Sequence, residues 1–428
     1  MTEASIWVGL LDLDGSEPVR DVSGPVGGQH GLARIMVRMH RAPIGYVELP
    51  AAPAETLTER AASLAEQTLA EPLRRHEELD KAAEEAEPAQ AGTPGWLAAV
   101  SCPHRFPASG GPGITIIVCT RDRKEGLQDC LRSLQQVTYE PLEILVVDNA
   151  PTTDSTRELV TSLAAQDARI RYTCEPRPGL SRARNHGLAE ATHELVAFTD
   201  DDVRVDPGWA AATAAGFAAD PETVCVTGLV ASSSLDTASE RYFDSRYSWG
   251  EAFDPRRYDL DENRYPAPLY PYSVGVIGTG ANFAFRRDVV RNLGDFDPIL
   301  GAGGPGRGGE DLDMFLRILL SGGRISYLPA SLVWHAHRAD LAALSEQIYY
   351  YGYGLGAYLS KNLLNGKMPA VLLRRGLGQI GVVLGRTRQA SDASQMRDGG
   401  RKLLLTEGRG VLAGALRYRL ASRKAGKN

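Results

Sequence analysis

Short apolar runs alternate with amphipathic segments through the middle of the chain. ITIIVCT (residues 114–120) and LEILVVDN (residues 142–149) are continuous and β-branched-rich, as strands buried on both faces of a parallel sheet are. Further strands are predicted at residues 170–175, 194–200 and 224–230, and helices at residues 125–136, 154–165, 180–190 and 209–219. This rhythm predicts an α/β fold with a mixed, mostly parallel sheet and helices on both faces.

The N-terminal part of the chain follows another pattern. Residues 33–50 contain two alternating runs around a turn, which predict a hairpin. Residues 56–85 are rich in Ala, Glu and Leu and predict one or two helices. Pro and Gly then punctuate residues 87–95 and 106–113, which indicates a linker. We therefore expect a small N-terminal α+β domain at residues 1–100 before the central domain.

The C-terminal part is predicted to be mostly helical, at residues 341–364 and 371–385. The Gly and Tyr spacing in YYYGYGLGAY indicates tight helix packing, with an amphipathic surface helix as the alternative. The expected organisation is thus the N-terminal domain, a central α/β domain at residues 111–338 and a helical C-terminal region at residues 339–428.

Composition and charge narrow the classes of protein. The 428 residues carry a formal net charge of −6, which argues against nucleic acid as a partner of the whole molecule. Residues 361–428 nevertheless contain 15 Lys and Arg against 3 Asp and Glu. This basic region is either a solvated helical face or a peripheral contact with an anionic membrane. Scattered cysteines without a CxxC pair, no signal peptide and no long apolar run predict a cytoplasmic protein.

Three consecutive aspartates follow a predicted buried strand in FTDDDVRVDPGW. Asp200 and Asp202 would point the same way from an extended chain, because side chains alternate along it. A hard divalent cation such as Mg²⁺ or Mn²⁺ would relieve the repulsion among Asp200, Asp201 and Asp202. The alternative is an acidic turn with a helix cap before Pro207.

Two further strand ends carry groups suited to a nucleotide. PRPGLSRARNHG places Arg177 and Arg184 around a predicted helix start, and both guanidinium groups and helix N-termini suit phosphate. Ordinary surface arginines are the alternative. Asp148 ends the strand in VVDNAP, where a carboxylate can accept from a nucleobase or a ribose hydroxyl. A turn-forming Asp-Asn pair is the alternative there.

A glycine-rich loop leads to another acidic pair. Six glycines lie between Gly301 and Gly309, which suggests an unpacked lid that moves over a substrate. Glu310 and Asp311 follow at a helix start, where one carboxylate is expected to cap the helix and the other could act as general base. LVWHAHRAD then ends a strand with His335 and His337, and a metal-ligand role for one of them is weighed against a structural one.

Together these segments resemble glycosyltransferase family 2, with its nucleotide-diphosphosugar-binding GT-A fold. Five segments carry the resemblance in order: CTRDR, VVDNAP, RPGLSRARNHG, FTDDD with DPGW, and GGED followed by a WH pair. The resemblance implies an inverting transfer of a sugar from a UDP-, GDP- or dTDP-sugar to an acceptor hydroxyl, with Mn²⁺ or Mg²⁺ as cofactor. The donor-binding residues that it implies are Thr120, Arg121, Asp148, Arg177, Arg184, Asp200 and Asp201. The implied metal ligands are Asp202 and His335, and the implied base is Asp311 with support from Glu310.

Two other functions compete with this interpretation. A nucleotidyltransferase would need a Gly-rich phosphate loop directly after the first strand, and CTRDRKEG is not such a loop. A catalytically silent nucleotide-sugar-binding scaffold would not need the Glu310–Asp311 pair. The aromatic-rich segment at residues 232–272 either recognises the acceptor or fills a core.

Overall fold

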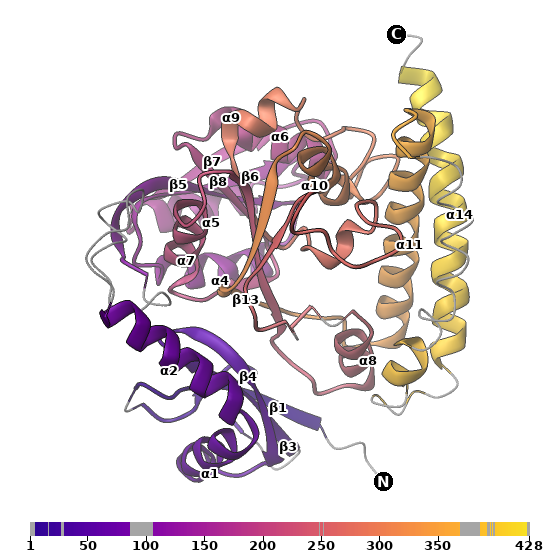
Figure 1. Cartoon of the computed structure of the whole chain (residues 1–428). Coiled ribbons are helices and arrows are strands. Elements are labelled where there is room, and N and C mark those ends of the chain that lie inside the picture. Colours follow the sequence, from indigo (N-terminus) through magenta and orange to yellow (C-terminus); the bar gives the residue numbers. More distant parts are fainter. Residues whose placement is uncertain are drawn as a thin grey trace.

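The described part of the chain builds two sheets and a long C-terminal helix pair (Figure 1). A computed structural model describes residues 5–15, 17–26, 30–85, 106–247, 249–250, 252–368, 386–391, 394, 396 and 399–425. The predicted linker at residues 87–95 and the predicted helix at residues 371–385 lie outside the described residues. No helix in the described ranges combines the length and apolar character needed to cross a membrane.

The N-terminal sheet contains the predicted hairpin. Among the described residues its strand order is β2 (Arg20–Asp21), β1 (Ser5–Asp12), β3 (His30–Met39) and β4 (Ala42–Pro50). β3 and β4 pair antiparallel, which confirms the hairpin, whereas β1 pairs parallel with β3 and was not predicted. Helix α1 (Ala54–Thr68) packs on the sheet through Leu57, Ala61 and Ala65, and α2 (Ala70–Glu85) follows it. The sheet and α1 share a hydrophobic core of their own.

A buried arginine joins this unit to the rest of the chain. The Arg38 side chain, which is 2% exposed, donates to Asp12 at 2.7 Å and to Asp206 at 2.5 Å. Asp206 follows the short strand β9 (Val203–Val205), and therefore lies a few residues beyond the three aspartates. The N-terminal sheet is thus anchored close to the segment in which the aspartates lie.

The main sheet is mixed and mostly parallel, as predicted. In the described part of the chain it has nine strands, of which β9 pairs with β13 at the side of the main path. The main path runs β11 (Arg256–Tyr258), β13 (Arg324–His335), β10 (Thr223–Ser232), β12 (Asn282–Arg286), β8 (Leu195–Asp200), β5 (Ser109–Thr120), β6 (Glu140–Asn149) and β7 (Ile170–Glu175). β12 runs antiparallel to both neighbours, whereas β5, β6, β7 and β8 are mutually parallel.

Helices cover both faces of this sheet, because alternate side chains of the buried strands point to opposite faces. Ile116 and Val118 of β5 pack with Leu127 of α4 (Lys124–Gln135), in the core that also takes side chains from α5 (Ser155–Ala164) and α7 (Trp209–Ala218). Ile117 points the other way and packs with Ala183 of α6 (Leu180–Glu190). The core on that face also includes α10 (Glu310–Leu320).

Parallel pairing brings the strand ends to one edge. Thr120 at the end of β5 is in register with Asp148 of β6, and Cys119 with Asp200 of β8. His335 ends β13 and pairs with Val203 of β9. The predicted site residues on these strands therefore lie along one rim, as the topology requires.

Two expectations about connecting segments were wrong. The predicted linker at residues 106–113 is partly strand, because β5 begins at Ser109. The glycine-rich loop is packed rather than free: Gly306 N donates to Ile299 O at 2.6 Å, and Leu180 N donates to Ala302 O at 2.8 Å. Because glycine has no side chain, a glycine-rich loop can pack tightly. A high glycine content therefore does not by itself indicate an unpacked lid.

Tight helix packing occurs in the C-terminal region, although the second helix of the contact, α14, was not predicted. Helices α11 (Leu341–Leu364) and α14 (Gly399–Ala425) lie side by side in Figure 1. A Cβ atom on Gly356 would lie 2.0 Å from Val411 O, and one on Gly414 would lie 1.9 Å from Tyr353 O. Glycines on both helices therefore let the two backbones touch, as the YYYGYGLGAY spacing predicted.

Candidate functional site

The three aspartates point to three different sets of partners. Asp200 is the last residue of β8, and Arg184 Nη2 lies 3.6 Å from its Oδ1. The turn that follows carries Asp201 and Asp202 to other partners. Burial, only partly offset by Arg184, raises the pKa of Asp200 to about 8. Asp201 and Asp202 do lie in a turn, as the alternative expected, and each of the three carboxylates has an arginine partner.

Asp201 serves as an internal anchor. Its carboxylate is 6% exposed and accepts from Thr120 Oγ1 at 2.7 Å and from Arg123 Nη1 at 2.6 Å. Burial, the largest effect, raises its pKa to about 6, while Arg123 and Thr120 act in the opposite sense. Thr120 and Asp201, both predicted to bind the donor, are thus hydrogen-bonded to each other in this structure.

Asp202 lies against the end of β13. Its Oδ1 is 3.5 Å from His335 Nε2, and its Oδ2 is 3.0 Å from Arg123 Nη2. Asp200, Asp202 and His335 form a group whose ligand atoms all lie within 4.8 Å of one another. This group could hold a metal ion, and it contains Asp202 and His335, the two residues predicted as ligands.

The two histidines of WHAHR have different surroundings. Burial lowers the pKa of His335, which favours the neutral form that can bind a metal. Its ring stacks on that of His337 at a centroid distance of 5.0 Å. His337 instead contacts Ser232 Oγ at 2.9 Å and the Phe243 ring at 4.3 Å. His335 is therefore the histidine that faces the aspartates.

Arg184 lies beneath the site rather than at its surface. Its side chain is 3% exposed and donates to Glu310 Oε1 at 2.9 Å and to Gly280 O at 3.0 Å. Its guanidinium also lies 5.1–5.7 Å from the ring centroids of Phe198, Phe283 and Phe296. In this structure Arg184 links the aspartate cluster to the acidic pair.

The acidic pair begins α10, and the preceding Gly309 has φ of 80°. Glu310 is buried, and burial raises its pKa while Arg184 opposes the shift. Asp311 is half-buried. A Cβ atom on Gly280 would lie 3.3 Å from Asp311 Oδ2 and 3.2 Å from Arg184 Nη2. The two carboxylates thus have different surroundings: Glu310 pairs with Arg184 in the interior, and Asp311 lies beside the Gly280 backbone.

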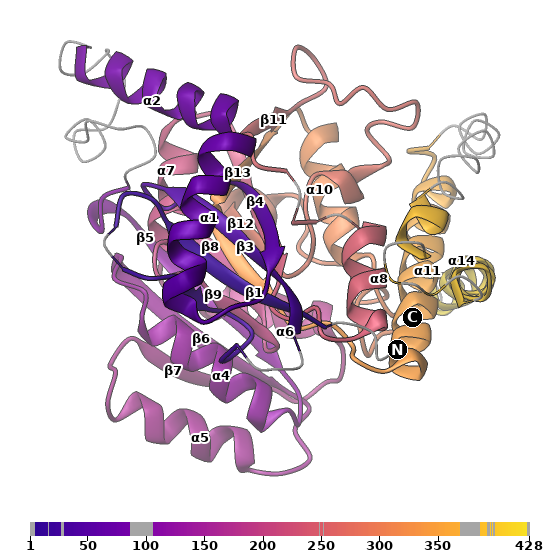
Figure 2. The same ribbon diagram turned by 90° about the horizontal axis from the view of Figure 1, so that it is seen from below.

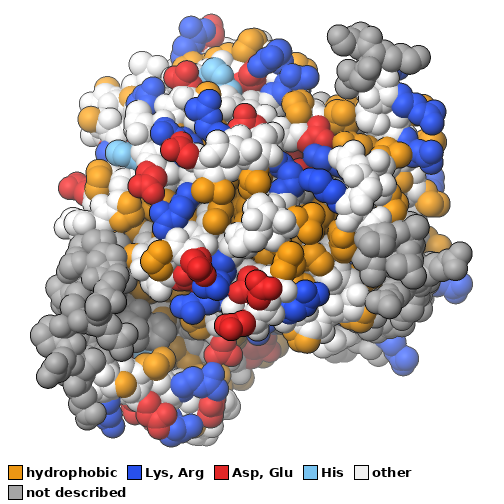
Figure 3. Space-filling model, turned by 45° about the horizontal axis from the view of Figure 1, so that its top comes forward, with side chains coloured by type: hydrophobic (Ala, Val, Ile, Leu, Met, Phe, Trp, Pro, Cys, Tyr) orange, Lys and Arg blue, Asp and Glu red, His pale blue; other side chains and the backbone are white. Residues whose placement is uncertain are grey.

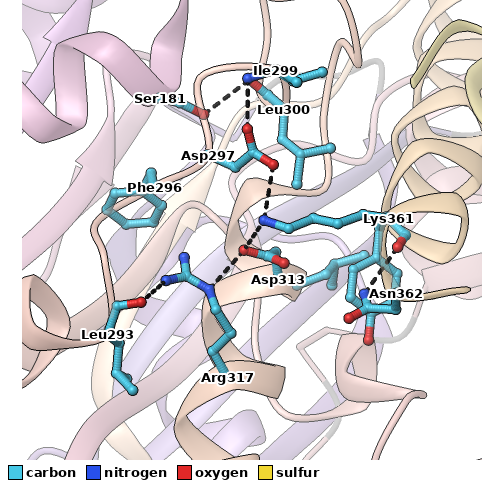
Figure 4. Close-up of polar contacts among 12 residues, drawn as sticks. Ser181, Leu293, Phe296, Asp297, Ile299, Leu300, Asp313, Arg317, Lys361 and Asn362 are labelled. Carbon is cyan, nitrogen blue, oxygen red and sulfur yellow. Dashed lines mark hydrogen bonds and ion pairs between the residues drawn. The ribbon is translucent and has the colours of Figure 1, made fainter. Parts of the chain in front are cut away.

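Ion pairs connect α10 to α11 and to the loop that precedes α10 (Figure 4). Lys361 of α11 donates to both Asp297 and Asp313, each at 2.9 Å. Arg317 donates to Asp313 at 2.8 Å, and Ser181 Oγ donates to Leu300 O at 2.9 Å. This network connects α11, α10, the loop before it and the start of α6. The C-terminal helix pair therefore supports the acidic pair.

The residues predicted to bind the nucleotide lie at the ends of β5, β6 and β7. Asp148 is fully buried, accepts from Tyr172 Oη at 3.1 Å, and has a buried Oδ1 without a hydrogen-bond partner. Burial raises its pKa. The side chains of Arg121 and Arg177 are more exposed, at 48% and 68%. Arg177 folds back on Glu175, with its Nε 2.9 Å from Oε1.

Three functional candidates were missed from the sequence. Arg123 bridges Asp201 and Asp202, although CTRDR was recognised as a motif. Arg338 Nη2 lies 3.8 Å from Asp202 Oδ2. Asn149 donates to Arg177 O and accepts from Gly179 N, each at 2.9 Å, and so fixes the turn before α6. The sequence carried one signal for Arg123 and Arg338, which is their positive charge in a chain with a carboxylate cluster. It carried no comparable signal for Asn149.

The aromatic-rich segment is largely core. Tyr242, Phe243, Tyr258 and Tyr270 are buried and belong to hydrophobic clusters. These four rings are therefore not available to stack on an acceptor in this structure, whereas Tyr265 and Tyr272 are only partly buried.

The glycosyl transferase family 2 model matches residues 115–294. The chain is 27% identical over 291 residues to a pre-mycofactocin glycosyltransferase of Mycobacterium tuberculosis, covering 66% of this chain and 56% of that protein. It is 31% identical over 258 residues to the succinoglycan biosynthesis protein ExoM of Rhizobium meliloti, covering 58% of this chain and 75% of that protein. The chain thus spans just over half the length of the mycobacterial relative.

Among solved structures, the chain is similar to the mannosyltransferase PcManGT from Pyrobaculum calidifontis in complex with GDP-Man and Mn²⁺. The sequence identity is 19% and the TM-score is 0.49, with 83% of this chain and 96% of that chain covered.

Proposed function

Because the chain belongs to glycosyltransferase family 2, we propose that it transfers a sugar from a nucleotide-diphosphate donor to an acceptor hydroxyl. One observation carries the proposal. The Arg184 guanidinium lies between two acidic groups. Its Nη2 is 3.6 Å from Asp200, which belongs to the group formed with Asp202 and His335, and its Nη1 donates to Glu310, the neighbour of Asp311, at 2.9 Å. One buried side chain therefore contacts both the cation site and the acidic pair that contains the candidate base.

Asp202 and His335, with Asp200, would hold Mn²⁺ or Mg²⁺. The 3.5 Å between Asp202 Oδ1 and His335 Nε2 is close to the roughly 3 Å between adjacent ligands of an octahedral ion with bonds of about 2.1 Å. When bound, the ion would neutralise charge on the leaving diphosphate. Burial acts to raise the pKa of Asp202, and His335, Arg123 and Arg338 together hold it below its usual value.

Asp311 would take the proton from the acceptor hydroxyl. Glu310 is committed to Arg184 inside the protein, so its role in this proposal is to position Arg184 and the start of α10. Asp311 is the more accessible of the two carboxylates. With one base and no covalent intermediate, a single displacement would invert the anomeric carbon.

The nucleotide would lie along the ends of β5 and β6. The unpartnered Oδ1 of Asp148 supports a role in accepting from the base or ribose, since a buried acceptor without a partner is costly. Thr120 is in register with Asp148 and donates to Asp201, and Arg121 follows Thr120 at the end of β5. Arg177 would leave Glu175 to reach the diphosphate. This assignment favours a UDP-, GDP- or dTDP-sugar without choosing among them.

The test is a thermal-shift and turnover screen of the purified chain against nucleotide-sugars with and without Mn²⁺. We expect at least one donor to raise the melting temperature and to be hydrolysed or transferred only when Mn²⁺ is present. Asp202→Ala should remove both effects. If no donor binds, or if Asp202→Ala leaves binding and turnover unchanged, the proposal fails. Binding without turnover by the unaltered protein would favour the silent scaffold, and release of pyrophosphate would favour a nucleotidyltransferase.

We further propose that α14 rests on an anionic membrane surface while the acceptor is processed. Its exposed face carries Leu405, Leu412 and Leu416, which are 63%, 75% and 61% exposed. The same helix also carries seven exposed basic residues: Arg401, Lys402, Arg409, Arg417, Arg419, Arg423 and Lys424. Blue and orange side chains lie together along the right-hand edge of Figure 3. Apolar and basic side chains together suit an anionic bilayer.

Sedimentation with vesicles tests the membrane contact. Binding is expected to vesicles that contain phosphatidylglycerol, to weaken as salt is raised, and to be lost in Leu412→Glu. Leu79→Glu replaces an exposed leucine of α2 and serves as the matched control. Equal binding to neutral phosphatidylcholine vesicles, or full binding by Leu412→Glu, would rule out this contact.

A further inference from the structure

A second group of metal-binding side chain types lies in the N-terminal unit, away from the family 2 site. His40 occupies the turn between β3 and β4, and His76 and Asp80 lie one turn apart on α2. His40 Nδ1 is 3.2 Å from His76 Nε2 and 3.2 Å from Asp80 Oδ2. His76 Nε2 is 3.9 Å from Asp80 Oδ1. The ligand atoms of the three residues lie within 4.8 Å of one another.

One acceptor in this arrangement has no hydrogen bond. A neutral imidazole nitrogen either carries a proton or offers a lone pair. A proton on His40 Nδ1 can be directed at Asp80 Oδ2 and at a lone pair on His76 Nε2, which leaves Asp80 Oδ1 aside. Asp80 Oδ1 is also buried without a hydrogen-bond partner. A cation between the three residues would accept all of these lone pairs at once.

The spacing fits a tetrahedral ion. Zinc bonds to imidazole nitrogen and carboxylate oxygen of about 2.0–2.1 Å place adjacent tetrahedral ligands roughly 3.3 Å apart. Two of the measured separations are 3.2 Å, and the third is 3.9 Å. Small side-chain adjustments therefore suffice to bring the three atoms into one coordination sphere.

The surroundings shield the group from water. His76 is 5% exposed, and the side chains of His40 and Asp80 are 12% and 20% exposed. His40 and Arg41 have φ of 51° and 65°, as the two central residues of a two-residue hairpin turn commonly do. The short turn leaves His40 in contact with both His76 and Asp80 of α2.

We propose that His40, His76 and Asp80 bind one divalent transition-metal ion, with Zn²⁺ preferred, and that this ion fixes α2 to the β3–β4 turn. Two imidazoles and one carboxylate are a donor set that suits zinc, with a fourth position left for water. None of the described side chains of α2 belongs to a hydrophobic cluster, although α1 contributes several to the N-terminal core. Figure 2 shows α2 projecting beyond the sheets. The ion would supply the attachment that apolar packing does not.

The test measures metal binding by the whole chain. The protein is stripped with a chelator and titrated with Zn²⁺ against a coloured competitor, and then loaded with Co²⁺ for visible spectroscopy. We expect one Zn²⁺ equivalent that is lost in His76→Gln and Asp80→Asn but retained in Glu77→Gln, an exposed neighbour on the same helix. The Co²⁺ form should show the intense visible bands of a four-coordinate ion. Zn²⁺ should raise the melting temperature of the unaltered protein and of Glu77→Gln only.

Asp202→Asn separates this site from the family 2 site. It should retain the Zn²⁺ equivalent and the four-coordinate Co²⁺ spectrum. Zinc stoichiometry unchanged by Asp80→Asn, or a Co²⁺ spectrum abolished by Asp202→Asn and not by Asp80→Asn, would overturn the proposal. If His76→Gln does not fold, Asp80→Asn and the Co²⁺ spectrum of the unaltered chain still decide it. Failure here leaves the nucleotide-sugar screen unaffected, because the two sites share no residue.

Discussion

Arg184 of α6 donates to Glu310 of α10 across 2.9 Å, and both side chains are almost completely buried. The pair joins the helix after β7 to the helix that carries Asp311. The same guanidinium lies 3.6 Å from Asp200 and beside three aromatic rings. A buried charge is tolerated only with a partner, so Arg184 and Glu310 must stay together. Because Arg184 also packs against core rings, the position of the acidic pair depends on the packing of the core.

Arg184→Met should destabilise the protein by about 3–5 kcal/mol, because it leaves the Glu310 carboxylate buried without its partner. Urea unfolding followed by circular dichroism gives the free energy of unfolding. Combining Arg184→Met with Glu310→Gln should be less destabilising than the sum of the two single changes. Additive effects would mean that the two residues contribute independently.

Asp311→Asn should lower transfer by about 10²–10⁴-fold, the range that a general base contributes, and leave donor affinity nearly unchanged. The measurements are steady-state turnover and calorimetric titration of the donor with Mn²⁺. Asp288→Asn, at a carboxylate on α9 (Arg287–Asn292) that is 80% exposed, is the control and should change neither. Loss of donor binding in Asp311→Asn would contradict the assignment of Asp311 as base.

The sequence predicted the central sheet well because its signals are local. The segments IRYTCE and LSRARNHGLAE predicted β7 and α6 with the bounds that the structure has. The family resemblance grouped Asp202 with His335, and the two side chains lie 3.5 Å apart. The Arg123 bridge and the inward turn of Arg184 could not be predicted, because they depend on side-chain directions across several elements. The closed packing of the Gly301–Gly309 loop depends equally on contacts distant in sequence.

His335→Ala should weaken Mn²⁺ binding at least about 10-fold, because even residues outside the first coordination shell contribute that much. His337→Ala should have a smaller effect, since His337 contacts Ser232 and Phe243 rather than the aspartates. Electron paramagnetic resonance of free Mn²⁺ during titration measures both affinities. Equal losses in the two variants would show that the stacked rings act as one unit and that His335 has no special role.

Stability in acid should depend on Glu175. Hydrogen bonds from Arg177 are the largest effect on the pKa of Glu175. They lower it from 4.5 to about 2, although burial acts to raise it. A carboxylate with a depressed folded-state pKa stabilises the protein above its unfolded-state pKa, and the contribution is lost as pH falls through the folded-state value. Between pH 4.5 and about 2 the free energy of unfolding should therefore fall less steeply in Glu175→Gln than in the unaltered protein. Glu158→Gln, at an exposed position of α5, should keep the original slope.

The α11–α14 contact is set by glycines, and one substitution tests it. Gly356→Ala would place a Cβ atom 2.0 Å from Val411 O, so the helices must separate, and we expect a loss of about 1–3 kcal/mol in the free energy of unfolding. Gly408→Ala lies in α14 with no neighbouring atom within 4 Å. There the same change should stabilise by roughly 0.5–1 kcal/mol, because alanine has the higher helix propensity. Lys361 of α11 holds Asp313 of α10, so Gly356→Ala should also lower turnover, and Gly408→Ala should not. Equal melting temperatures for the two variants would mean that α14 does not hold α11 in solution.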